Sequence, residues 1–413
     1  MTYDQALQYI KQVENFGSKP GLSRIEKLLS VLGNPQNTLK FIHIGGTNGK
    51  GSTTTMTANA LNYAGYKVGK YISPYVYEFG ERISIDNVNI SPEKLAIYVE
   101  KIKQAIQLND LATDHPSEFE IITTIAFLYF NDENCDIVCL EVGLGGTLDA
   151  TNVINSPLLS VITKISLDHT QVLGDNVEQI AKEKCGIIKN SYTITYPKQQ
   201  ENVLAVIASL SNFLAMPDIS RLEILTCDIS GSEIIYNDKR YKISLLGEHQ
   251  IYNAITVIEI LNMVNTLGFK ISFKNIYKAL SNTYFSARME IISQNPLVII
   301  DGSHNLDGIM ALEHSLKTLF KDKSVLTIMG MLKDKDYIPC VEKISSLCTT
   351  ILFTDINNPR SASSETLLKY SKCKNSMSFS SVENALDMVK NFEKDVILVC
   401  GSLYLAQDIK KFF

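Results

Sequence analysis

The sequence predicts an α/β fold built on mostly parallel sheets, and three features of the chain lead to this prediction. Short apolar runs alternate with segments whose apolar residues recur at helical spacing. These runs lack a regular alternation of apolar and polar residues, which is typical of strands covered by helices on both faces. An early run, at residues 41–44, leads into a glycine-rich turn and then a helix. In sheets of this class, ligands bind outside the carboxyl ends of the strands.

The composition is that of a globular protein without a polyanionic partner. The chain has 413 residues, enough for about two or three domains, and 45% of its residues are hydrophobic and 20% charged. Because the net charge is -5 and no block of Lys and Arg occurs, we expect no nucleic-acid partner. The eight cysteines lack paired spacing, which indicates neither a zinc site nor a disulfide framework. The most apolar helical segment, Ile121–Phe130, is about half as long as a membrane span, so we expect a cytoplasmic monomer without a membrane partner.

The elements of the first predicted domain, residues 1–293, follow from periodicity and turn residues. Helices are predicted at Tyr3–Phe16, Ser23–Leu32, Ser52–Tyr63, Ser91–Leu108, Glu118–Phe130, Asn176–Ile188 and Gln250–Leu267. Strands are predicted at 41–44, Lys67–Ile72, Asp136–Glu141 and Leu159–Ile165, with hairpin strands within Glu223–Ile243 and a loop at 79–83. The residues GSKPG at 17–21 separate the first two helices.

The second predicted domain, residues 294–413, begins where the pattern loosens between Phe285 and Asn295. Its apolar strands are predicted at Leu297–Asp301, Val325–Met329, Ile351–Thr354 and Val396–Cys400, with helices near Leu306, Asp336, Ser364 and Val382. This renewed alternation of strands and helices predicts a second α/β domain, with the boundary near Gln294.

The glycine turn after the first strand has the features of a phosphate site. A strand that feeds a glycine turn at a helix start aims backbone N–H groups and the helix dipole at one point. Lys50, between Gly49 and Gly51, would add a positive charge there. The spacing differs from the common nucleotide-binding loop, because Gly51 stands where Ser or Thr usually follows the lysine. A turn that only joins a strand to a helix is the alternative, but it leaves the lysine between glycines unexplained.

Four polar residues, Lys50, Ser73, Glu141 and His169, follow four different predicted strands. A carboxylate such as Glu141 is costly at the end of an apolar strand unless it is paired or bound to a metal ion. Mg²⁺ takes few protein ligands and fills its remaining positions with water and phosphate oxygens. The sequence alone leaves Glu141 open as a surface carboxylate and His169 as a hydrogen-bonded loop histidine.

Further candidates remain open on residue patterns alone. Lys184 beside Glu183 is consistent with a solvated helix pair, and the residues DGSHN at 301–305 are consistent with a polar turn. Arg288 suits either a boundary ion pair or a bidentate phosphate contact. Aromatic residues that could stack on a flat ring, but are equally consistent with the core, are Tyr75, Tyr77, Phe79 and Phe119.

Seven strings of residues together carry a resemblance to one family. They are GTNGKGS at Gly46–Ser52, EVGLGGTLDATN at Glu141–Asn152, LDH at Leu167–His169, EKCGI at Glu183–Ile187, HQIYNA at His249–Ala254, DGSHN at Asp301–Asn305 and GSLYL at Gly401–Leu405. In this order, and over essentially the whole chain, the sequence resembles the folylpolyglutamate synthase/dihydrofolate synthase family of the Mur-ligase superfamily. The resemblance implies an N-terminal P-loop ATPase domain of the Mur-ligase type and a smaller, Rossmann-like C-terminal α/β domain.

The activity that this resemblance implies is ATP-dependent amide formation. ATP would phosphorylate the carboxylate of dihydropteroate or of a reduced folate, and the amino group of L-glutamate would attack the resulting acyl phosphate. Two Mg²⁺ ions are implied as cofactors, and K⁺ is a further candidate. Because ATP and the pterin would bind to the first domain and glutamate to the second, closure would be needed to exclude water from the acyl phosphate.

The resemblance also implies roles for individual residues. The triphosphate would be held by Gly49, Lys50, Gly51 and Ser52, with further ATP contacts from Asn253, Arg288 and Asp301. The implied metal ligands are Ser73, Glu141, His169 and Lys184, the lysine as an N6-carboxylated side chain. Lys50, His169 and Lys184 are the implied catalytic residues. The pterin would lie near Gly21, Leu22, Phe119, Leu148, Asp149 and Ala150, and glutamate near His304 and Ser402, with Arg82 as a further candidate.

Three positions depart from the family pattern. Thr147 stands where many relatives have Arg, Ser286-Ala287-Arg288 replaces the usual PGR, and Ser303 replaces Ala. We expect the first change to weaken a substrate contact and the second to make the linker less stiff.

Three other function classes compete with the folate ligase. A ligase of peptidoglycan precursors is disfavoured by the strings GTNGKGS, DATN and DGSHN. A P-loop kinase or ATPase leaves the C-terminal strings DGSHN and GSLYL without a role. A non-catalytic nucleotide-binding module leaves the run of expected ligands unexplained.

Overall fold

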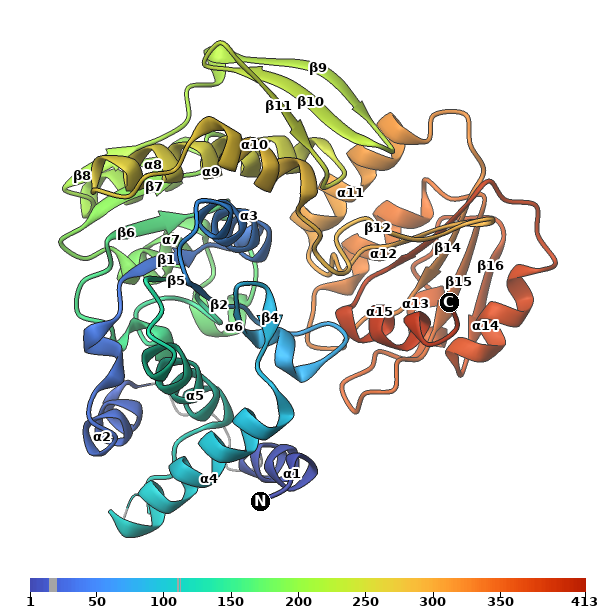
Figure 1. Ribbon diagram of the computed structural model, residues 1–413. Helices are drawn as coiled ribbons and strands as arrows, with labels where there is room; N and C mark the ends of the chain where they lie inside the picture. Colours follow the sequence, from blue (N-terminus) through green and yellow to red (C-terminus); the bar gives the residue numbers. More distant parts are fainter. Residues whose placement is uncertain (15–20, 110, 112) are drawn as a thin grey trace. The chain divides into compact units, whose positions relative to one another are not determined.

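The computed structural model describes residues 1–14, 21–109, 111 and 113–413, and it divides into two compact units (Figure 1). Unit 1 comprises Met1–Ile219 and Tyr252–Ala279, and unit 2 comprises Ser220–Ile251 and Leu280–Phe413. The division falls within helices α9 (Glu248–Thr266) and α10 (Phe273–Asn282). The continuous boundary near Gln294 stays a prediction. Among the described residues, no helix combines the length and apolar character that crossing a bilayer requires.

Unit 1 contains an eight-stranded sheet in the order β4-β3-β2-β5-β1-β6-β7-β8. Six of its strands, from β2 to β8 in that order, are parallel, whereas β3 and β4 are antiparallel additions at one edge. The strands are β1 (Phe41–Gly45), β2 (Val68–Tyr71), β3 (Ile83–Ile85), β4 (Val88–Asn89), β5 (Ile137–Glu141), β6 (Leu159–Ile162), β7 (Tyr192–Thr195) and β8 (Phe213–Ala215).

Helices cover both faces of this sheet, as buried parallel strands require (Figure 1). Helix α3 packs on β1, β2 and β5, and the opposite face carries a core in which Phe127 of α5 meets Phe41 of β1 edge-on at 5.6 Å between ring centroids. Besides most of α9 and α10, the unit 1 helices are α1 (Tyr3–Glu14), α2 (Ser23–Val31), α3 (Lys50–Tyr63), α4 (Pro92–Leu108), α5 (Glu118–Asp132), α6 (Thr170–Leu173), α7 (Val177–Lys184) and α8 (Glu201–Leu210).

Unit 2 contains a three-stranded antiparallel sheet and a six-stranded sheet in the order β12-β13-β17-β14-β15-β16. The larger sheet is parallel apart from β12. The strands are β9 (Leu222–Asp228), β10 (Gly231–Tyr236), β11 (Lys239–Ile243), β12 (Glu290–Gln294), β13 (Leu297–Ile300), β14 (Val325–Met329), β15 (Thr350–Thr354), β16 (Ser376–Phe379) and β17 (Val396–Cys400). The helices are α11 (Leu306–Leu319), α12 (Tyr337–Ser345), α13 (Ser364–Leu368), α14 (Val382–Val389) and α15 (Leu403–Lys410).

These two mostly parallel sheets confirm the predicted α/β class, and the predicted elements recur with shifted ends. The strand predicted at Leu159–Ile165 ends at Ile162, because the backbone beyond it turns toward the glycine loop: Thr47 N and Asn48 N donate to Lys164 O at 2.8 and 3.1 Å. The predicted loop at 79–83 is a 3₁₀ turn over Phe79–Arg82 that runs into β3, and Glu78 and Glu81 cap the turn.

Other elements differ at one end or were not predicted. The helix predicted at Asn176–Ile188 becomes 3₁₀ after Lys184, and within that turn Gly186 packs so closely on Thr147 that a Cβ would lie 2.2 Å from its Oγ1. The sequence analysis assigned nothing between Lys189 and Glu223, where the structure has β7, α8 and β8. The predicted helix end at Phe16 and residues 17–20 of the GSKPG break lie outside the described residues.

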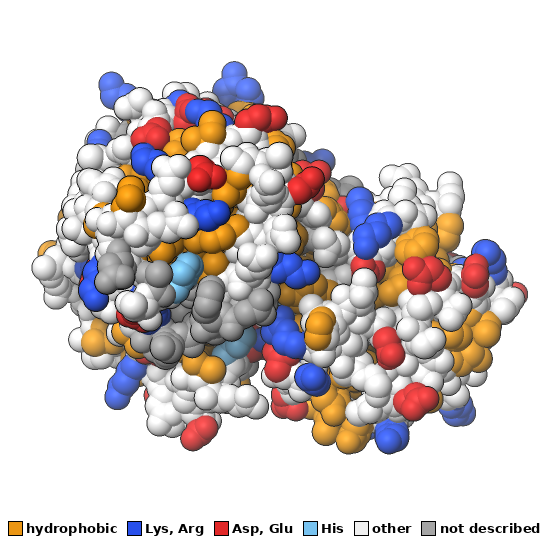
Figure 2. Space-filling view, turned by 90° about the horizontal axis from the view of Figure 1, so that it is seen from below, with side chains coloured by type: hydrophobic (Ala, Val, Ile, Leu, Met, Phe, Trp, Pro, Cys, Tyr) orange, Lys and Arg blue, Asp and Glu red, His pale blue; other side chains and the backbone are white. Residues whose placement is uncertain are grey.

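Acidic and basic side chains are interspersed on the face drawn in Figure 2, together with scattered apolar side chains. This distribution fits the modest net charge of -5.

Candidate functional site

The glycine loop between β1 and α3 is shaped by close backbone approaches. Gly46 has φ of +143°, and a Cβ there would lie 2.0 Å from Thr163 Oγ1. Gly49, the N-cap of α3, has φ of +88°, and its Cβ would lie 2.7 Å from Asn253 Oδ1. Both positions therefore require glycine, and the loop brings the predicted ATP residue Asn253 against the start of α3. The first N–H groups of α3 lack intrahelical acceptors, which makes this end a suitable anion cradle.

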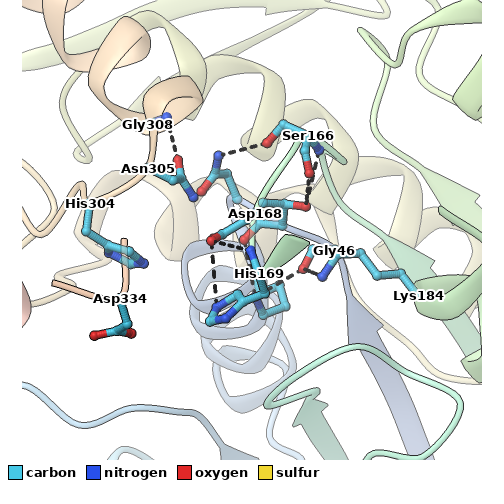
Figure 3. A network of polar contacts seen from close by, with 12 residues as sticks. Gly46, Ser166, Asp168, His169, Lys184, His304, Asn305, Gly308 and Asp334 are labelled. Carbon is cyan, nitrogen blue, oxygen red and sulfur yellow. Dashed lines mark hydrogen bonds and ion pairs between the residues drawn. The ribbon is translucent and has the colours of Figure 1, made fainter. Parts of the chain in front are cut away.

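Two lysines converge on this loop. Lys50 Nζ donates to the carbonyl oxygens of Gly46 and Thr47 at 3.1 and 3.2 Å, and Lys184 Nζ donates to the same Gly46 oxygen at 3.0 Å (Figure 3). Lys184 is 4% exposed. Burial, and then the charge of Lys50, lower the pKa of Lys184 to about 7, although Asp168 opposes the shift. Because this pKa lies near physiological pH, part of the Lys184 amine is uncharged there and can act as a nucleophile or accept a modification.

The four polar residues predicted at the sheet edge follow the four neighbouring strands β2, β5, β1 and β6. Glu141 ends β5, is 4% exposed, and accepts a 3.3 Å hydrogen bond from the backbone N–H of Ser73. His169 lies at the N-cap of α6 with φ of +51°, and Asp168 lies beside it, with 3.8 Å between Asp168 Oδ1 and His169 Nε2 (Figure 3). The structure thus brings Ser73 to Glu141 and gives His169 a carboxylate neighbour.

The residues expected to bind metal suit a hard cation in their chemistry. Glu141 and Ser73 offer oxygen atoms, and the ring of His169 offers a nitrogen atom, with Asp168 Oδ1 3.8 Å from its Nε2. Among the described residues, no group of three or more His, Cys, Asp or Glu side chains is arranged to hold a metal ion. The expected set contains only two such side chains, Glu141 and His169, and it takes its other atoms from a hydroxyl and a modified lysine.

The loop after β5, residues 143–154, is held by buried hydrogen bonds. Asp149, 6% exposed, accepts bonds at Oδ2 from the backbone N–H groups of Gly143 and Leu144, at 3.1 and 2.8 Å. Its Oδ1 accepts from Thr151 N and Thr151 Oγ1, at 3.0 and 2.5 Å. Burial raises the pKa of Asp149, against the effect of these hydrogen bonds. Phe119 packs where a Cβ on Gly143 would lie 2.4 Å from its Cζ.

The same loop is tied to the segment that carries Lys184. Thr147 bonds the carbonyl oxygen of Glu183 through its backbone N–H at 3.0 Å and its hydroxyl at 3.1 Å. Asn152 Nδ2 donates to Thr147 O and to Gly186 O, both at 3.1 Å. Lys189 Nζ donates to Asn152 O at 2.8 Å. Thr147 therefore supports the loop. The sequence analysis, which considered Thr147 only as a replacement for the arginine of many relatives, did not suggest this role.

Some of the residues predicted to bind the pterin lie on or against this loop. Phe119 packs on it, Ala150 is buried within it, and Leu148 is exposed on it at 49%. Gly21 and Leu22 immediately precede helix α2.

Arg82, the further glutamate candidate in unit 1, lies against aromatic rings. Its guanidinium is 5.3 Å from the ring centre of Tyr75 and 5.6 Å from that of Phe79. Its Nη2 is 3.8 Å from Glu118 Oε1. The aromatic residues near position 75 therefore enclose this arginine, and Phe119 packs on Tyr71 with ring centroids 6.0 Å apart.

In unit 2, the predicted residues gather at the carboxyl ends of the neighbouring strands β13 and β17. Asp301, 3% exposed, accepts hydrogen bonds from the backbone N–H groups of Met289 and Ser303 at 3.0 and 2.9 Å. Arg288 lies close to this turn, because a Cβ on Gly302 would be 2.7 Å from its Nη1.

His304 and Ser402 are oriented by the backbone of the same edge of unit 2. His304 Nδ1 is 2.9 Å from Gly302 O. Because a carbonyl oxygen can only accept, Nδ1 carries the proton and a neutral ring keeps Nε2 as an acceptor. Ser402 caps helix α15 by accepting from Tyr404 N at 3.1 Å. Asn305 caps α11 by accepting from Gly308 N at 2.8 Å (Figure 3).

The sequence analysis missed several supporting residues. Thr163, Asn152 and Lys189 are examples, since each holds a loop of the site by a hydrogen bond or a close contact. One available signal was polar residues inside apolar strands, of which His43 in FIHIGG is the clearest.

Comparison with family descriptions gives two matches. The Mur ligase middle domain matches residues 44–261, and the Mur ligase glutamate ligase domain matches residues 287–403.

Curated proteins and solved structures match over almost the full chain. The dihydrofolate synthase/folylpolyglutamate synthase of Bacillus subtilis is 34% identical over 431 residues, covering 99% of this chain and 98% of the relative. The folylpolyglutamate synthase of Lacticaseibacillus casei is 32% identical over 425 residues, covering 100% and 98%. Mycobacterium tuberculosis folylpolyglutamate synthase complexed with ADP and AMPPCP superposes with a TM-score of 0.89 at 27% identity, covering 99% of this chain and 98% of that one. Escherichia coli FolC in complex with DHPP and ADP gives 0.86 at 28% identity, covering 98% and 97%.

Proposed function

This chain belongs to the folylpolyglutamate synthase/dihydrofolate synthase family of Mur ligases, and on this premise we propose that it joins L-glutamate to the carboxylate of dihydropteroate, of a reduced folate, or of both. The γ-phosphate of ATP passes to that carboxylate. The amino group of glutamate then attacks the acyl carbon, phosphate leaves, and an amide forms with loss of a proton. ADP and phosphate are the other products.

The glycine loop would hold the triphosphate through backbone N–H groups of Gly49–Ser52 and through Lys50. Support comes from the glycine geometry at Gly46 and Gly49, which keeps the backbone open, and from the position of Lys50 over the loop. Asn253, packed on Gly49, would add a contact from α9. Arg288 and Asp301 would contribute from unit 2.

The metal ligands that we propose are Ser73, Glu141, His169 and Lys184, for two Mg²⁺ ions, with K⁺ as a further cation. Bound magnesium offsets the repulsion between the substrate carboxylate and the triphosphate. Glu141 supplies a buried carboxylate for this purpose, and its contact with Ser73 N holds the end of β2 beside it.

Carboxylation of Lys184 is supported by its surroundings. A neutral amine adds CO₂ and releases a proton, which gives a carbamate with two oxygen ligands. The pKa of Lys184, near 7, leaves a large neutral fraction at physiological pH. The carbamate would also turn the repulsion between Lys184 and Lys50 into attraction.

Unit 2 would present glutamate. His304, whose Nδ1 lies 2.9 Å from Gly302 O, would accept a hydrogen bond from the amine at Nε2 when the ring is neutral. Ser402 and, from unit 1, Arg82 are the other glutamate candidates. The substrate ring and its attached carboxylate would lie along loop 143–154 with Leu148, Asp149 and Ala150, and beside Phe119.

The convergence of Lys50 and Lys184 on one carbonyl oxygen at the glycine loop carries this proposal, because a kinase or ATPase needs only the first of them. The test is phosphate release from ATP with L-glutamate and either dihydropteroate or tetrahydrofolate. We expect release that requires glutamate and a pterin together. Release without glutamate would indicate a kinase or ATPase and would overturn the proposal. Comparing the two pterins decides which synthase activity the protein has.

A further inference from the structure

A buried series of hydrogen bonds links the strand before the glycine loop to the loop after β5. His43 lies in the middle of β1, is 0% exposed, and has its Nε2 2.8 Å from Thr151 Oγ1. Thr151 Oγ1 in turn donates to Asp149 Oδ1 at 2.5 Å. Asp149 Oδ2 accepts from the backbone N–H groups of Gly143 and Leu144. Thr151 and Asp149 are 0% and 6% exposed, so water has almost no access to these hydrogen bonds.

The direction of each bond follows from the acceptor at its end. An ionised carboxylate only accepts, so the Thr151 hydroxyl proton points to Asp149. The Thr151 oxygen can then receive a hydrogen only from the ring of His43, which fixes the Nε2–H tautomer. Burial, and then the charge of Lys189, lower the pKa of His43 to about 3, which agrees with a neutral ring.

Packing alone does not account for a histidine at this position. Nδ1 of His43 is buried and has no hydrogen-bond partner among the residues that the structure describes. A buried polar atom without a partner costs free energy, whereas a leucine in a central strand would carry no such cost. The bond to Thr151 is therefore the specific gain that this imidazole brings.

We propose that His43 is a positioning residue for the folate-side substrate. His43 holds Thr151 so that the Thr151 hydroxyl keeps its bond to Asp149, and Asp149 in turn fixes the backbone of loop 143–154. This inference rests on the proposed function, because that function places the pterin substrate along this loop. The same contact attaches the loop to the middle of β1.

The first test needs no ligand and measures amide hydrogen exchange in the full-length chain, at Gly143 and Leu144. Thr151→Val keeps the shape of the side chain and removes the hydroxyl, and we expect exchange there to accelerate about tenfold or more, as a lost buried bond of about 1.4 kcal/mol implies. Thr151→Ser restores the hydroxyl and should restore protection. Thr193→Val is the matched control, since Thr193 is also 0% exposed in the same sheet and its hydroxyl has no partner within the described part of the chain.

The second test separates positioning from plain packing by steady-state kinetics. With tetrahydrofolate or dihydropteroate, whichever the wild type uses, we expect Thr151→Val and His43→Leu to raise the KM of the pterin about ten- to hundredfold, as loss of a supporting partner does elsewhere. The KM of ATP should change less than about twofold. His43→Gln, whose amide N–H₂ can replace Nε2–H, should recover much of the loss.

Two outcomes would overturn the inference. Lower thermal midpoints with unchanged exchange at residues 143 and 144 and unchanged KM would overturn the inference and make His43 a packing residue. Equal increases in the KM of the pterin and of ATP would also overturn it. If Thr151→Val fails to fold, the His43→Leu and His43→Gln pair decides by the same criteria. Failure of the proposed function would look different, because wild-type protein would then release no glutamate-dependent phosphate with either pterin.

Discussion

The carboxyl edges of the two parallel sheets both gather polar side chains, but they stabilise them differently. In unit 1 the charged residues Glu141, Asp149 and Lys184 are at most 6% exposed, and Lys184 lies near a second lysine. In unit 2 the buried carboxylate of Asp301 accepts two backbone N–H groups, the neutral residues Asn305 and Ser402 cap the following helices, and His304 is only half-buried.

This difference indicates how the two edges divide the chemistry. Buried charges are costly unless each meets an opposite charge, and the unit 1 edge buries both carboxylates and a lysine, so it is suited to a polyanion and cations that bind together. Hydrogen bonds from backbone N–H groups to Asp301 and to the two caps hold the unit 2 turns whether or not a ligand is present, which suits a surface that selects a small zwitterion. Substitutions at the first edge should therefore affect chemistry most, and substitution of His304 at the second should affect the recognition of glutamate.

The largest expected effect is that of Lys184→Ala. We expect activity to fall about a hundredfold or more, because the variant loses a proposed metal ligand and a preorganised charge at the glycine loop. Folding should be normal, as judged by circular dichroism and thermal unfolding. Lys182→Ala, on the exposed side of the same helix, is the control and should retain activity. Near wild-type turnover in Lys184→Ala would remove the carbamate assignment.

Glu141→Gln should have the next largest effect. The amide keeps the size of the side chain but loses the charge, so we expect the Mg²⁺ concentration for half-maximal activity to rise about ten- to hundredfold. Titration of activity with Mg²⁺ at saturating ATP measures this shift. Glu178→Gln, at a half-buried position on α7 whose carboxylate bonds Asn202, serves as the control. An unchanged Mg²⁺ dependence would return Glu141 to a purely structural role.

In unit 2, the variant His304→Ala tests whether His304 recognises glutamate alone among the three substrates. We expect the KM of glutamate to rise about tenfold, the cost of one hydrogen bond to a charged group, while the KM values of ATP and of the pterin stay the same. His314→Ala on the neighbouring helix α11 is the control, since that histidine bonds Glu248 at the surface. A fall in kcat with an unchanged glutamate KM would mean that His304 acts in the chemical step instead.

The pH dependence of stability sharpens the contrast further. In bicarbonate-free buffer, folded Lys184 has a pKa near 7, whereas its ordinary value of 10.5 applies when the chain is unfolded. Between these values the unfolded chain binds the extra proton. The stability contributed by this group therefore falls as the pH drops from 10.5 to 7, by up to about 1.4 kcal/mol per pH unit.

Lys184→Met should remove this slope. The measurement is the unfolding free energy of the variant minus that of the wild type from pH 7 to 9.5. We expect this difference to shrink as the pH rises, because the wild type gains stability with rising pH and the variant does not. A difference that stays constant over this range would show that folded Lys184 keeps its proton.

The sequence predicted the fold and the location of the site because both depend on local patterns. Apolar runs mark buried strands, and Lys50, Ser73, Glu141 and His169 follow strands that turn out to be adjacent. The hydrogen bonds of Thr147, Asn152 and Lys189 could not be predicted, since they join segments more than thirty residues apart. The strands β7 and β8 were missed for a different reason: they are short, and Tyr192 and Phe213 are exposed in them, so the buried-strand pattern is weak.

The smallest effect that we predict concerns the caps of unit 2. Asn305→Ala removes the acceptor for Gly308 N at the start of α11, and we expect it to lower the unfolding free energy by about 1 kcal/mol. Asn305→Ser keeps an acceptor and should cost little. Urea unfolding followed by circular dichroism measures both, and the KM of glutamate should change less than about twofold because the cap is a structural contact. A tenfold rise in that KM for Asn305→Ala, absent in Asn305→Ser, would show that the cap also sets the position of His304, and the two edges would then be alike in relying on supported side chains for binding.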